Sequence, residues 1–182
     1  MLPTQNTIPE SARPVALVTG ASDRIGAAIA ATLAAEGYAV VIHYRSGAEG
    51  ALAVCQGIRD AGGKAEIVQA DLANRAERAT LIERAGAFFG PLTVLINNAS
   101  TFEPDAATDV EETLWDAHFA VHAEAPVFLA RDFAAQLPDG VEGNIINMID
   151  ERVLHPTPGY FSYTLSKSVL WTATRTLAQS LA

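Results

Sequence analysis

Short apolar runs alternate with longer helix-like segments along the chain from Pro14 onward. The runs are five or six residues long and almost continuously apolar, which is typical of strands buried on both faces of a parallel sheet. We expect strands at residues 15–19, 38–43, 65–69, 92–96 and 145–149. Repeated strand–helix units of this kind predict an α/β fold, with a doubly wound parallel sheet in three α/β/α layers.

The segments between these strands carry apolar residues spaced by three or four, as amphipathic helices do. We expect helices at residues 25–36 and 47–61, from Asn74 onward, and from about 110 to 136. The residues expected to face the core are Ile25, Ile29 and Leu33 in the first helix, and Leu81, Ile82, Ala85 and Phe88 or Phe89 in the third. Asn74 and Glu77 resemble a capping box, and Pro126 predicts a bend or break in the last helix.

The connections predict which ends of the strands meet. Right-handed crossovers place the first three strands in the spatial order 3-2-1, with the fourth and fifth strands on the other side. In such sheets ligands bind at the carboxyl ends of the strands, near the switch between the first and fourth strands. Gly20, Asn97 and Asp150 all lie at such ends, so we expect one site there.

Composition narrows the class of protein. The net charge of −9 argues against nonspecific nucleic-acid binding, and no apolar run approaches the ~18 residues of a membrane span. Residues 1–13 lack the apolar centre of a signal peptide, so we expect a flexible tail, one domain over 14–182 and a cytoplasmic protein. The single Cys55 is expected in the core, and no Cys or His spacing predicts a metal site.

A glycine-containing turn follows the first strand: Thr19-Gly20-Ala21-Ser22-Asp23-Arg24-Ile25-Gly26. Glycines permit a tight turn and close approach by a phosphate, and the following helix offers unpaired N–H groups. Arg24 adds a permanent positive charge. The alternative is a tight strand–helix turn that binds no ligand.

The second strand ends in His43-Tyr44-Arg45-Ser46, without the acid that holds the ribose 2′-hydroxyl in NAD-selective sites. Arg45 and Ser46 suit a 2′-phosphate instead, through charge-assisted hydrogen bonds. The sequence therefore predicts NADP(H) rather than NAD. The alternative for Arg45 is an ordinary exposed arginine.

Tyr163 and Lys167 are four residues apart in a helical pattern, so their side chains share one face. A nearby ammonium favours phenolate, and we therefore expect a lowered pKa for Tyr163 and a role as proton donor. This spacing often arises by chance and acquires meaning only from its surroundings.

Those surroundings resemble the short-chain dehydrogenase/reductase family, whose fold is Rossmann-like. The resemblance rests on TGASDRIG, Asp71-Leu72, Asn97-Asn98-Ala99 and Tyr163-x-x-x-Lys167, in order over nearly the whole chain. The family usually has Gly where this chain has Arg24, and Ser where it has Asp150. In both departures, and in HYRS, NNAS followed by Phe102, and NMID, the chain is similar to pteridine reductases.

The resemblance implies a role for each matching position. Gly20, Arg24, Ile25 and Gly26 would lie along the cofactor phosphates, and His43, Tyr44, Arg45 and Ser46 at the 2′-phosphate end. Asp71 and Leu72 would contact the adenine, and Asn97, Ala99 and Ser100 the ribose and nicotinamide. Tyr163 would donate or relay a proton, and Lys167 would orient the nicotinamide ribose. Phe102, Ser100, Asp150 and Tyr163 would line the site for a flat pterin.

Asp150 separates two kinds of substrate. A carboxylate repels a developing alkoxide, which disfavours simple ketone reduction. A protonated Asp150 would donate to a pterin ring nitrogen, whereas an ionised one would accept from an amino-pterin N–H. The third interpretation is a solvent-facing loop acid beside Glu151 and Arg152.

Two departures from the family affect the expected activity. His122 stands where the family commonly has an Asn that helps to hold a water near the lysine. Members of the family also have two more strands beyond the position where this sequence ends. Without them the fifth strand would be an exposed apolar edge. We therefore expect either an incompletely represented chain or a short variant completed by a partner. His43, His118 and His155 are expected at the surface or in local hydrogen bonds.

The sequence therefore leaves three functions open. The first is an NADPH-dependent reductase of a dihydropteridine or dihydrofolate-like molecule. The second is a carbonyl or 3-oxoacyl reductase, and the third a non-catalytic nucleotide-binding protein. The resemblance implies a small-molecule substrate and a homo-oligomer, tetramer or dimer.

Overall fold

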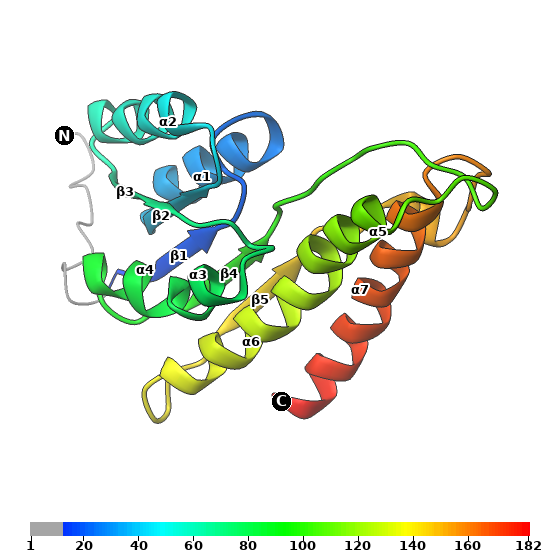
Figure 1. Cartoon of the computed structure of the whole chain (residues 1–182). Helices are drawn as coiled ribbons and strands as arrows, with labels where there is room; N and C mark the ends of the chain where they lie inside the picture. The colour runs from blue at the N-terminus through cyan, green and yellow to red at the C-terminus, as the bar shows by residue number, and fades with distance from the viewer. Residues whose placement is uncertain (1–12) are drawn as a thin grey trace, which may run out of the picture.

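The computed structural model describes residues 13–182, so most of the predicted tail lies outside the described residues. Five parallel strands form one sheet in the order β3-β2-β1-β4-β5. Their bounds are β1 Val15–Val18, β2 Ala39–Tyr44, β3 Lys64–Gln69, β4 Val94–Asn97 and β5 Asn144–Asn147. The predicted order is confirmed, and the strand ends differ from the prediction by one or two residues (Figure 1).

Helices cover both faces of the sheet and complete the three predicted layers (Figure 1). They are α1 Arg24–Ala35, α2 Ala48–Asp60, α3 Arg75–Ala79, α4 Leu81–Phe89, α5 Glu112–Phe119, α6 Ala125–Gln136 and α7 Phe161–Ser180. Helices α1 and α2 pack on one face, α4 and α6 pack on the other, and α7 runs beside α5.

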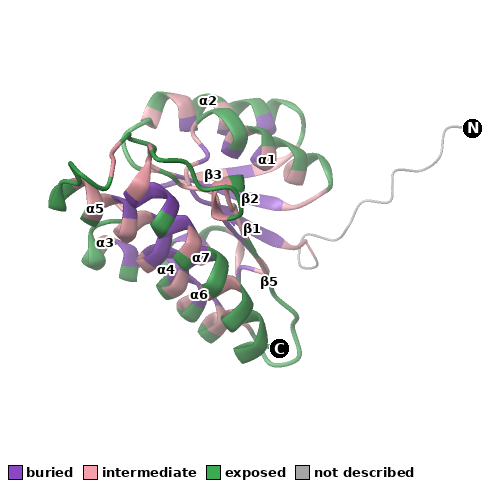
Figure 2. Cartoon of the chain, turned by 90° about the vertical axis from the view of Figure 1, so that its right-hand side faces the viewer, coloured by how far each residue is buried: buried purple, intermediate pink, exposed green. Residues whose placement is uncertain are grey.

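The core consists of two apolar clusters, one on each face of the sheet. Leu17 and Val41 belong to the cluster that also contains Leu81, Leu129 and Phe133, whereas Val18 and Ile42 belong to the cluster under α1 and α2. Strands β1 and β2 are therefore buried on both sides, as their continuous apolar sequences predict (Figure 2). Cys55 is buried in the second cluster, as expected.

Two details of the helices differ from the prediction. Ile25 is 58% exposed, because it lies in the first turn of α1, beyond the part of that helix that packs on the sheet. The helix after Asn74 is interrupted at Thr80, which separates α3 from α4. The capping box is only half formed: the Asn74 side chain accepts from the N–H groups of Ala76 and Glu77, but the Glu77 carboxylate accepts from the Asp71 N–H.

The predicted irregularity near Pro126 is a π-helical turn, Ala120–Glu124, that joins α5 to α6. The N–H of Ala125 donates to the carbonyl of Ala120, five residues back. Pro126 has no N–H and lies in the first turn of α6, where that loss is tolerated. The side chains of α5 and of the π turn are thereby rotated relative to those of α6.

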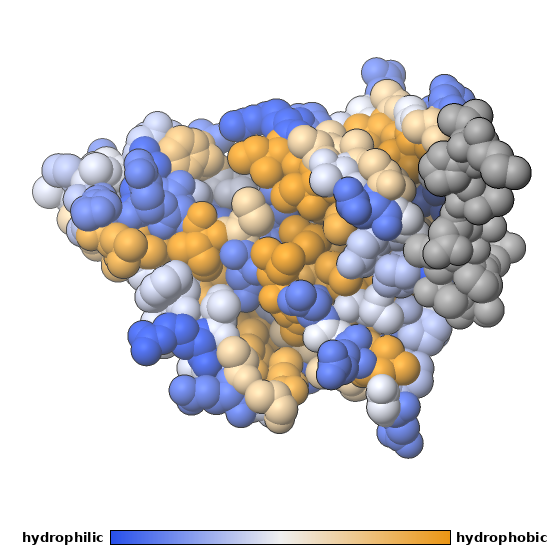
Figure 3. Space-filling model, turned by 180° about the vertical axis from the view of Figure 1, so that it is seen from behind, coloured by the Kyte–Doolittle hydropathy of each residue, from blue (hydrophilic) through white to orange (hydrophobic). Residues whose placement is uncertain are grey.

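Strand β5 pairs with β4 and with no other strand of the described sheet. Ile145 packs against the core, whereas Ile146 on the opposite face is 45% exposed. Figure 3, which shows the molecule from behind, has hydrophobic residues gathered near its centre. No helix among residues 13–182 is both long and apolar enough to cross a membrane.

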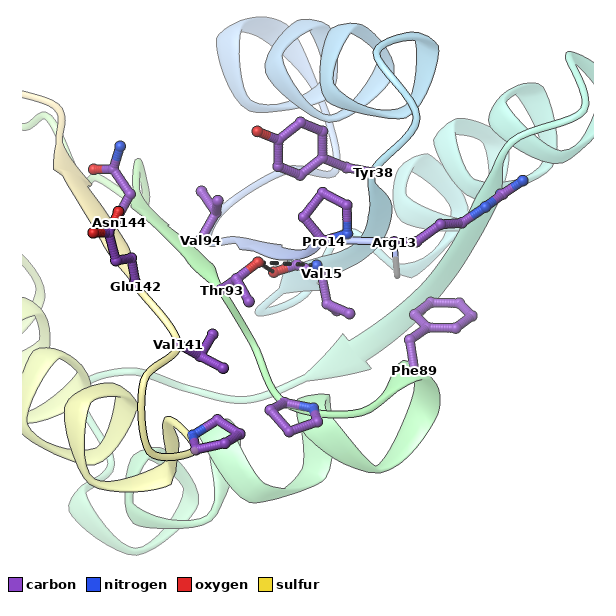
Figure 4. Close-up of a pocket in the computed structure, with 13 residues that line it drawn as sticks. Arg13, Pro14, Val15, Tyr38, Phe89, Thr93, Val94, Val141, Glu142 and Asn144 are labelled. Carbon is purple, nitrogen blue, oxygen red and sulfur yellow. Dashed lines mark hydrogen bonds between the residues drawn. The ribbon is translucent and has the colours of Figure 1, made fainter. Parts of the chain in front are cut away.

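A wide hollow of about 640 Å³ lies at the amino ends of the strands, where Val15, Thr93 and Asn144 line it (Figure 4). The Val15 N–H donates to the Thr93 hydroxyl at 3.2 Å and ties β1 to the residues that precede β4. None of the residues predicted to form the site lines this hollow. They lie at the opposite, carboxyl ends of the strands.

Candidate active site

A groove of about 190 Å³ lies at the carboxyl ends of the central strands. Eight of its lining residues were predicted from the sequence: Gly20, His43, Arg45, Ser46, Asp71, Leu72, Ala99 and Ser100. The other five were not: Ser22, Asp23, Gly47, Thr101 and Val121. Segments from β1, β2, β3, β4 and the π turn thus converge on one groove, as the strand order requires.

The turn after β1 is held too tightly for side chains at its glycines. Gly20 has a φ of +62°, and a Cβ placed on it would lie 2.7 Å from the Ala99 Cα. The side-chain amide of Asn98 donates to the carbonyl oxygens of Thr19 and Gly20, both at 2.9 Å. The turn is therefore packed closely against the residues that follow β4, and Gly20 lines the groove.

Replacing Gly26 by Ala is expected to lower the free energy of unfolding by about 1–3 kcal/mol, because the new methyl group has no room. Its Cβ would meet the Gly20 carbonyl oxygen and lie 2.6 Å from the Asn98 side-chain nitrogen and 2.8 Å from the Ala21 Cα. Urea unfolding measures the effect. The matched control is Gly57→Ala, which has open space around it in α2 and is expected to stabilise by about 0.5–1 kcal/mol.

Arg24 has a φ of 47°, a left-handed backbone conformation that is rare for a residue with a side chain. The conformation explains why the family usually has glycine at this position. Non-glycine residues held in it cost of order 1–3 kcal/mol and occur mainly at functional sites. An arginine kept here despite that cost is consistent with a role for its charge.

His43 connects the three strands that frame the groove. Its Nδ1 accepts from the Gly20 N–H at 3.1 Å, so in the neutral ring Nε2 carries the proton and donates to the Ala70 carbonyl at 3.0 Å. Burial lowers the pKa of His43 to about 4. The neutral ring positions the phosphate turn against β2, and both of its nitrogens are occupied by backbone groups.

Arg45 lies in the groove beyond the end of β2, next to Ser46 and across from Asp71 and Leu72. Its guanidinium forms no ion pair within residues 13–182, and the chain has no acid at the end of β2 itself. A free permanent cation beside a hydroxyl matches a phosphate rather than a ribose hydroxyl.

A second group of predicted residues meets beside the groove. The Tyr163 hydroxyl donates to Asp150 Oδ2 at 3.0 Å, and Lys167 Nζ donates to the Met148 carbonyl at 2.8 Å. Tyr163 and Lys167 are buried on α7, whereas Asp150 is partly exposed at the start of the short 3₁₀ helix Glu151–Val153. The structure thus brings the three predicted catalytic residues together.

The pKa expected for Tyr163 was wrong in direction. Burial raises the pKa of Tyr163, and the hydrogen bond to Asp150 and the charge of that carboxylate raise it further, while Ser100 and Arg152 act in the opposite direction. Burial also lowers the pKa of Lys167 to about 8, although the charge of Asp150 opposes this. The phenol is therefore protonated, and a carboxylate rather than the ammonium is in contact with it.

The pKa of Asp150 itself is lowered. Its burial acts to raise the value, but hydrogen bonds from the Arg152 backbone, the Tyr163 hydroxyl and the Arg152 guanidinium outweigh that effect. Asp150 is therefore a carboxylate in the free protein. Of the two states considered from the sequence, the structure favours the hydrogen-bond acceptor.

His122 and His118 form a buried pair that links the loop after β4 to α7. His122 Nε2 accepts from the Thr101 N–H at 3.2 Å, and its Nδ1 contacts the Ser166 hydroxyl at 2.9 Å. One turn earlier, His118 makes the equivalent contacts. Its Nε2 accepts from the Glu103 N–H at 3.5 Å, and its Nδ1 contacts the Ser162 hydroxyl at 2.6 Å. Burial lowers the pKa of His118, and that of His122 to about 3, so both rings are neutral.

Aromatic side chains form the outer wall of this cluster. Phe102 is 46% exposed and stacks on Tyr160, with ring centroids 4.2 Å apart and planes 7° apart. Its edge contact with Tyr163 has a centroid distance of 4.7 Å. Tyr160 has a φ of 62°, so a second strained residue lies at this site. A flat apolar surface next to the Tyr163 hydroxyl suits a planar ligand.

Apart from Tyr163 and Lys167, five of the predicted cofactor residues do not line the groove: Arg24, Ile25, Gly26, Tyr44 and Asn97. Asn97 donates to the Asn147 side chain at 2.8 Å and so joins β4 to β5. Tyr44 packs against the core, and Ile25 and Gly26 lie in the first turn of α1. Contact between these residues and the cofactor stays a prediction, and, apart from the charge of Arg24, it would be made through their backbone groups.

The structure also adds residues that the sequence interpretation did not use. Arg152 contacts Asp150, Tyr160 stacks on Phe102, and the Asp105 carboxylate accepts from the Ser162 N–H at the start of α7. The four-residue spacing of His118 and His122, matched by Ser162 and Ser166, was the signal that could have revealed the histidine pair. Among the described residues no group of His, Cys, Asp or Glu is placed to hold a metal ion.

Comparisons with known proteins show the family of the chain. Residues 14–182 match the model of the short chain dehydrogenase family. Pteridine reductase 1 of Leishmania tarentolae is 35% identical over 207 residues, covering 93% of this chain and 72% of that protein. The crystal structure of FolM alternative dihydrofolate reductase 1 from Brucella canis, complexed with NADP, is 45% identical with a TM-score of 0.90, covering 95% of this chain and 68% of that one. The angucycline C-6 ketoreductase LanV with bound NADP is 33% identical with a TM-score of 0.86, covering 92% and 68%.

The chain therefore belongs to the short-chain dehydrogenase family, and the predicted family and fold are confirmed. The pteridine reductase resemblance inferred from the sequence is also supported. The chain spans 65%, 67% and 72% of the lengths of three curated relatives that it matches.

Proposed function

We propose that this protein is an NADPH-dependent reductase that acts on a pteridine, such as a dihydropteridine or a dihydrofolate-like molecule. The observation that carries the proposal is the Asp150 carboxylate bound to the Tyr163 hydroxyl beside the NADP-type groove. A hydroxyl at position 150 would assist ketone reduction, whereas a carboxylate accepts an N–H of a nitrogen heterocycle. Similarity to a pteridine reductase and to an alternative dihydrofolate reductase supports the same substrate class.

Residues 14–182 would form the cofactor-binding reductase domain. Gly20 and Gly26 would keep the turn close-packed, because neither position has room for a Cβ, and the free N–H groups at the start of α1 would bind the pyrophosphate. Arg45 and Ser46 would hold the 2′-phosphate, and Asp71 and Leu72 the adenine. Bound NADPH would supply the hydride. Three similar solved structures contain NADP, which supports the cofactor.

The residues around Tyr163 would handle the proton. The phenol is un-ionised in the free protein and so still carries the proton that it would transfer. Its O–H would turn from Asp150 to a substrate nitrogen or oxygen, and a substrate N–H would take its place on the carboxylate. Lys167, fixed by the Met148 carbonyl, would orient the nicotinamide ribose. Phe102 would cover the planar substrate, and Asp150 would accept one of its N–H groups.

The test follows NADPH oxidation by the purified protein with dihydrobiopterin, dihydrofolate and an acetoacetyl thioester. We expect turnover of at least one of the two pterins and little of the thioester. Preferential use of the thioester would support the alternative, a carbonyl or 3-oxoacyl reductase, which similarity to a ketoreductase favours. Tight NADPH binding without turnover by a chain that includes any further natural sequence would identify a non-catalytic nucleotide-binding protein.

Replacing Arg45 by Ala is expected to weaken NADPH binding about 10- to 100-fold and NADH binding by much less, because a charge-assisted contact of about 1.5–3 kcal/mol exists only for the phosphate. Fluorescence titration of each nucleotide measures this. The matched control is Arg175→Ala, an exposed arginine on α7 far from the groove. Equal losses for both nucleotides would contradict the NADP assignment.

We also propose that the protein assembles as a homo-oligomer. Leu165 and Val169, four residues apart on α7, are 36% and 43% exposed and form an apolar strip that a second copy could cover. Light scattering of the wild type and of Val169→Lys tests this, because a dimer or tetramer built on this strip would dissociate. Placement in the cytoplasm stays a prediction.

A further inference from the structure

Arg152 contacts both the acid and the aromatic wall of the site. Its backbone N–H donates to Asp150 Oδ1 at 2.9 Å, and its guanidinium Nη1 lies 3.2 and 3.4 Å from the two carboxylate oxygens. Its Cζ is 5.3 Å from the ring centroids of both Phe102 and Tyr160. Its Nε is buried without a hydrogen-bond partner. Arginine is thus held against the acid on one side and the aromatic wall on the other.

The other cation of the site is less suited to balance the Asp150 charge. Lys167 Nζ is committed to the Met148 carbonyl and lies 5.9 Å from the Tyr163 ring centroid. Burial also lowers the pKa of Lys167 to about 8, so its charge is partly lost in mildly alkaline solution. A guanidinium keeps its charge at every pH at which the protein is folded.

The remaining groups packed around the carboxylate supply no further positive charge. Helix α7 contributes Tyr163 and Lys167, and the 3₁₀ helix contributes Arg152. His118 and His122, whose rings contact the Tyr163 ring at centroid distances of 5.8 and 5.2 Å, are neutral. Within residues 13–182, Arg152 is therefore the one cation bonded to Asp150.

We propose that Arg152 is the positioning residue of this site, which keeps Asp150 ionised and directed at the Tyr163 hydroxyl. The proposal rests on the proposed reductase function and deepens it. It means that Asp150 acts as an acceptor toward the substrate N–H, that the transferred proton comes from Tyr163, and that Arg152 offsets the negative charge that remains beside Asp150 after the transfer. The sequence pattern would give this electrostatic role to Lys167 alone.

The test compares Arg152→Gln, which removes the charge but keeps a polar side chain, with Arg152→Lys, which restores a charge. The titration of Asp150 is followed by carboxyl ¹³C NMR, with Asp150→Asn to assign the signal. We expect the pKa of Asp150 to rise in Arg152→Gln and to return toward the wild-type value in Arg152→Lys. Arg175→Gln, at an exposed position of α7, should leave the titration unchanged.

The pH profile of kcat provides the second measurement. Its acid limb should move to higher pH in Arg152→Gln, and below that limb kcat falls about tenfold for each pH unit of displacement. A merely structural arginine would lower stability without moving either titration. An unchanged Asp150 pKa in folded Arg152→Gln, judged by circular dichroism, would overturn the proposal. If the wild type reduces no pterin but the Asp150 titration still moves, the substrate assignment fails while the role of Arg152 stands.

Discussion

The Tyr163→Phe variant is expected to lose about 10²- to 10⁴-fold in kcat while binding NADPH within a few-fold of the wild type, because positioned proton donors contribute rate factors of this size. The substitution removes only the hydroxyl that donates to Asp150 at 3.0 Å. The ring would keep its contacts with Phe102, His118 and His122. Asp150 would keep its bonds to Arg152, so we expect the loss in stability to be only about 1 kcal/mol.

Steady-state kinetics with a pterin, together with nucleotide titration and urea unfolding, separates these effects. Tyr38→Phe is the matched control, because Tyr38 lies at the amino ends of the strands, in the hollow of Figure 4. It should leave kcat unchanged. An unchanged kcat in Tyr163→Phe would show that another group delivers the proton.

The second large effect is expected from the pH dependence of stability. His122 has an ordinary pKa of 6.5 that burial, with Lys167 and His118 nearby, lowers to about 3 in the folded protein. The unfolded chain therefore binds a proton at His122 more readily than the folded chain does. The stability that the neutral ring contributes is complete above pH 6.5 and is lost as the pH falls from 6.5 toward 3. Between pH 6.5 and 5 the loss from this residue should be on the order of 2 kcal/mol.

Protonation of His122 also has a structural reason to be unfavourable. Its Nε2 accepts from the Thr101 N–H, and a protonated Nε2 would place two donors face to face. We therefore expect acid to release the loop that carries Phe102 from α7 before the whole protein unfolds. Hydrogen exchange of the Thr101 N–H should accelerate below pH 6.

Urea unfolding at several pH values between 5 and 7 measures the slope directly. His122→Asn, which has the residue common in the family, should be less stable at pH 7 but should show a shallower decline toward pH 5. His155→Asn is the control, because His155 is exposed. Identical slopes for the wild type and His122→Asn would contradict the role of the buried ring.

The sheet could be predicted from the sequence because its determinants are local and general. Continuous apolar runs identify buried parallel strands, and right-handed crossovers then leave few possible strand orders. Ile25 was placed wrongly in the core because a helical stripe does not show where along its length the helix leaves the sheet. The interruption at Thr80 depends on the packing of two short helices, and that residue is not a helix breaker.

The site was predicted as a set of residues, but its electrostatics were not. Lys167 is four residues from Tyr163, whereas Asp150 is thirteen residues away, so the sequence suggested the wrong contact charge. In the folded chain the distant carboxylate bonds to the phenol and the neighbouring ammonium turns to a backbone carbonyl. Arg152 was taken for part of an exposed loop, because nothing in the local sequence shows that the 3₁₀ helix folds it back onto Asp150.

Because of the π turn at Ala120–Glu124, the number of residues in this helix determines which side chains face α7 and which face the core. His118, upstream of the turn, and His122, within it, point toward α7, whereas Leu129 and Phe133, downstream of it, point into the core. A deletion of one residue in the turn would restore a regular α-helix and rotate one segment against the other by about 100°. The shortened helix could then bury its apolar face or present its histidines, but not both. Homologous chains that keep both features should therefore tolerate substitutions in this turn far better than a change in its length.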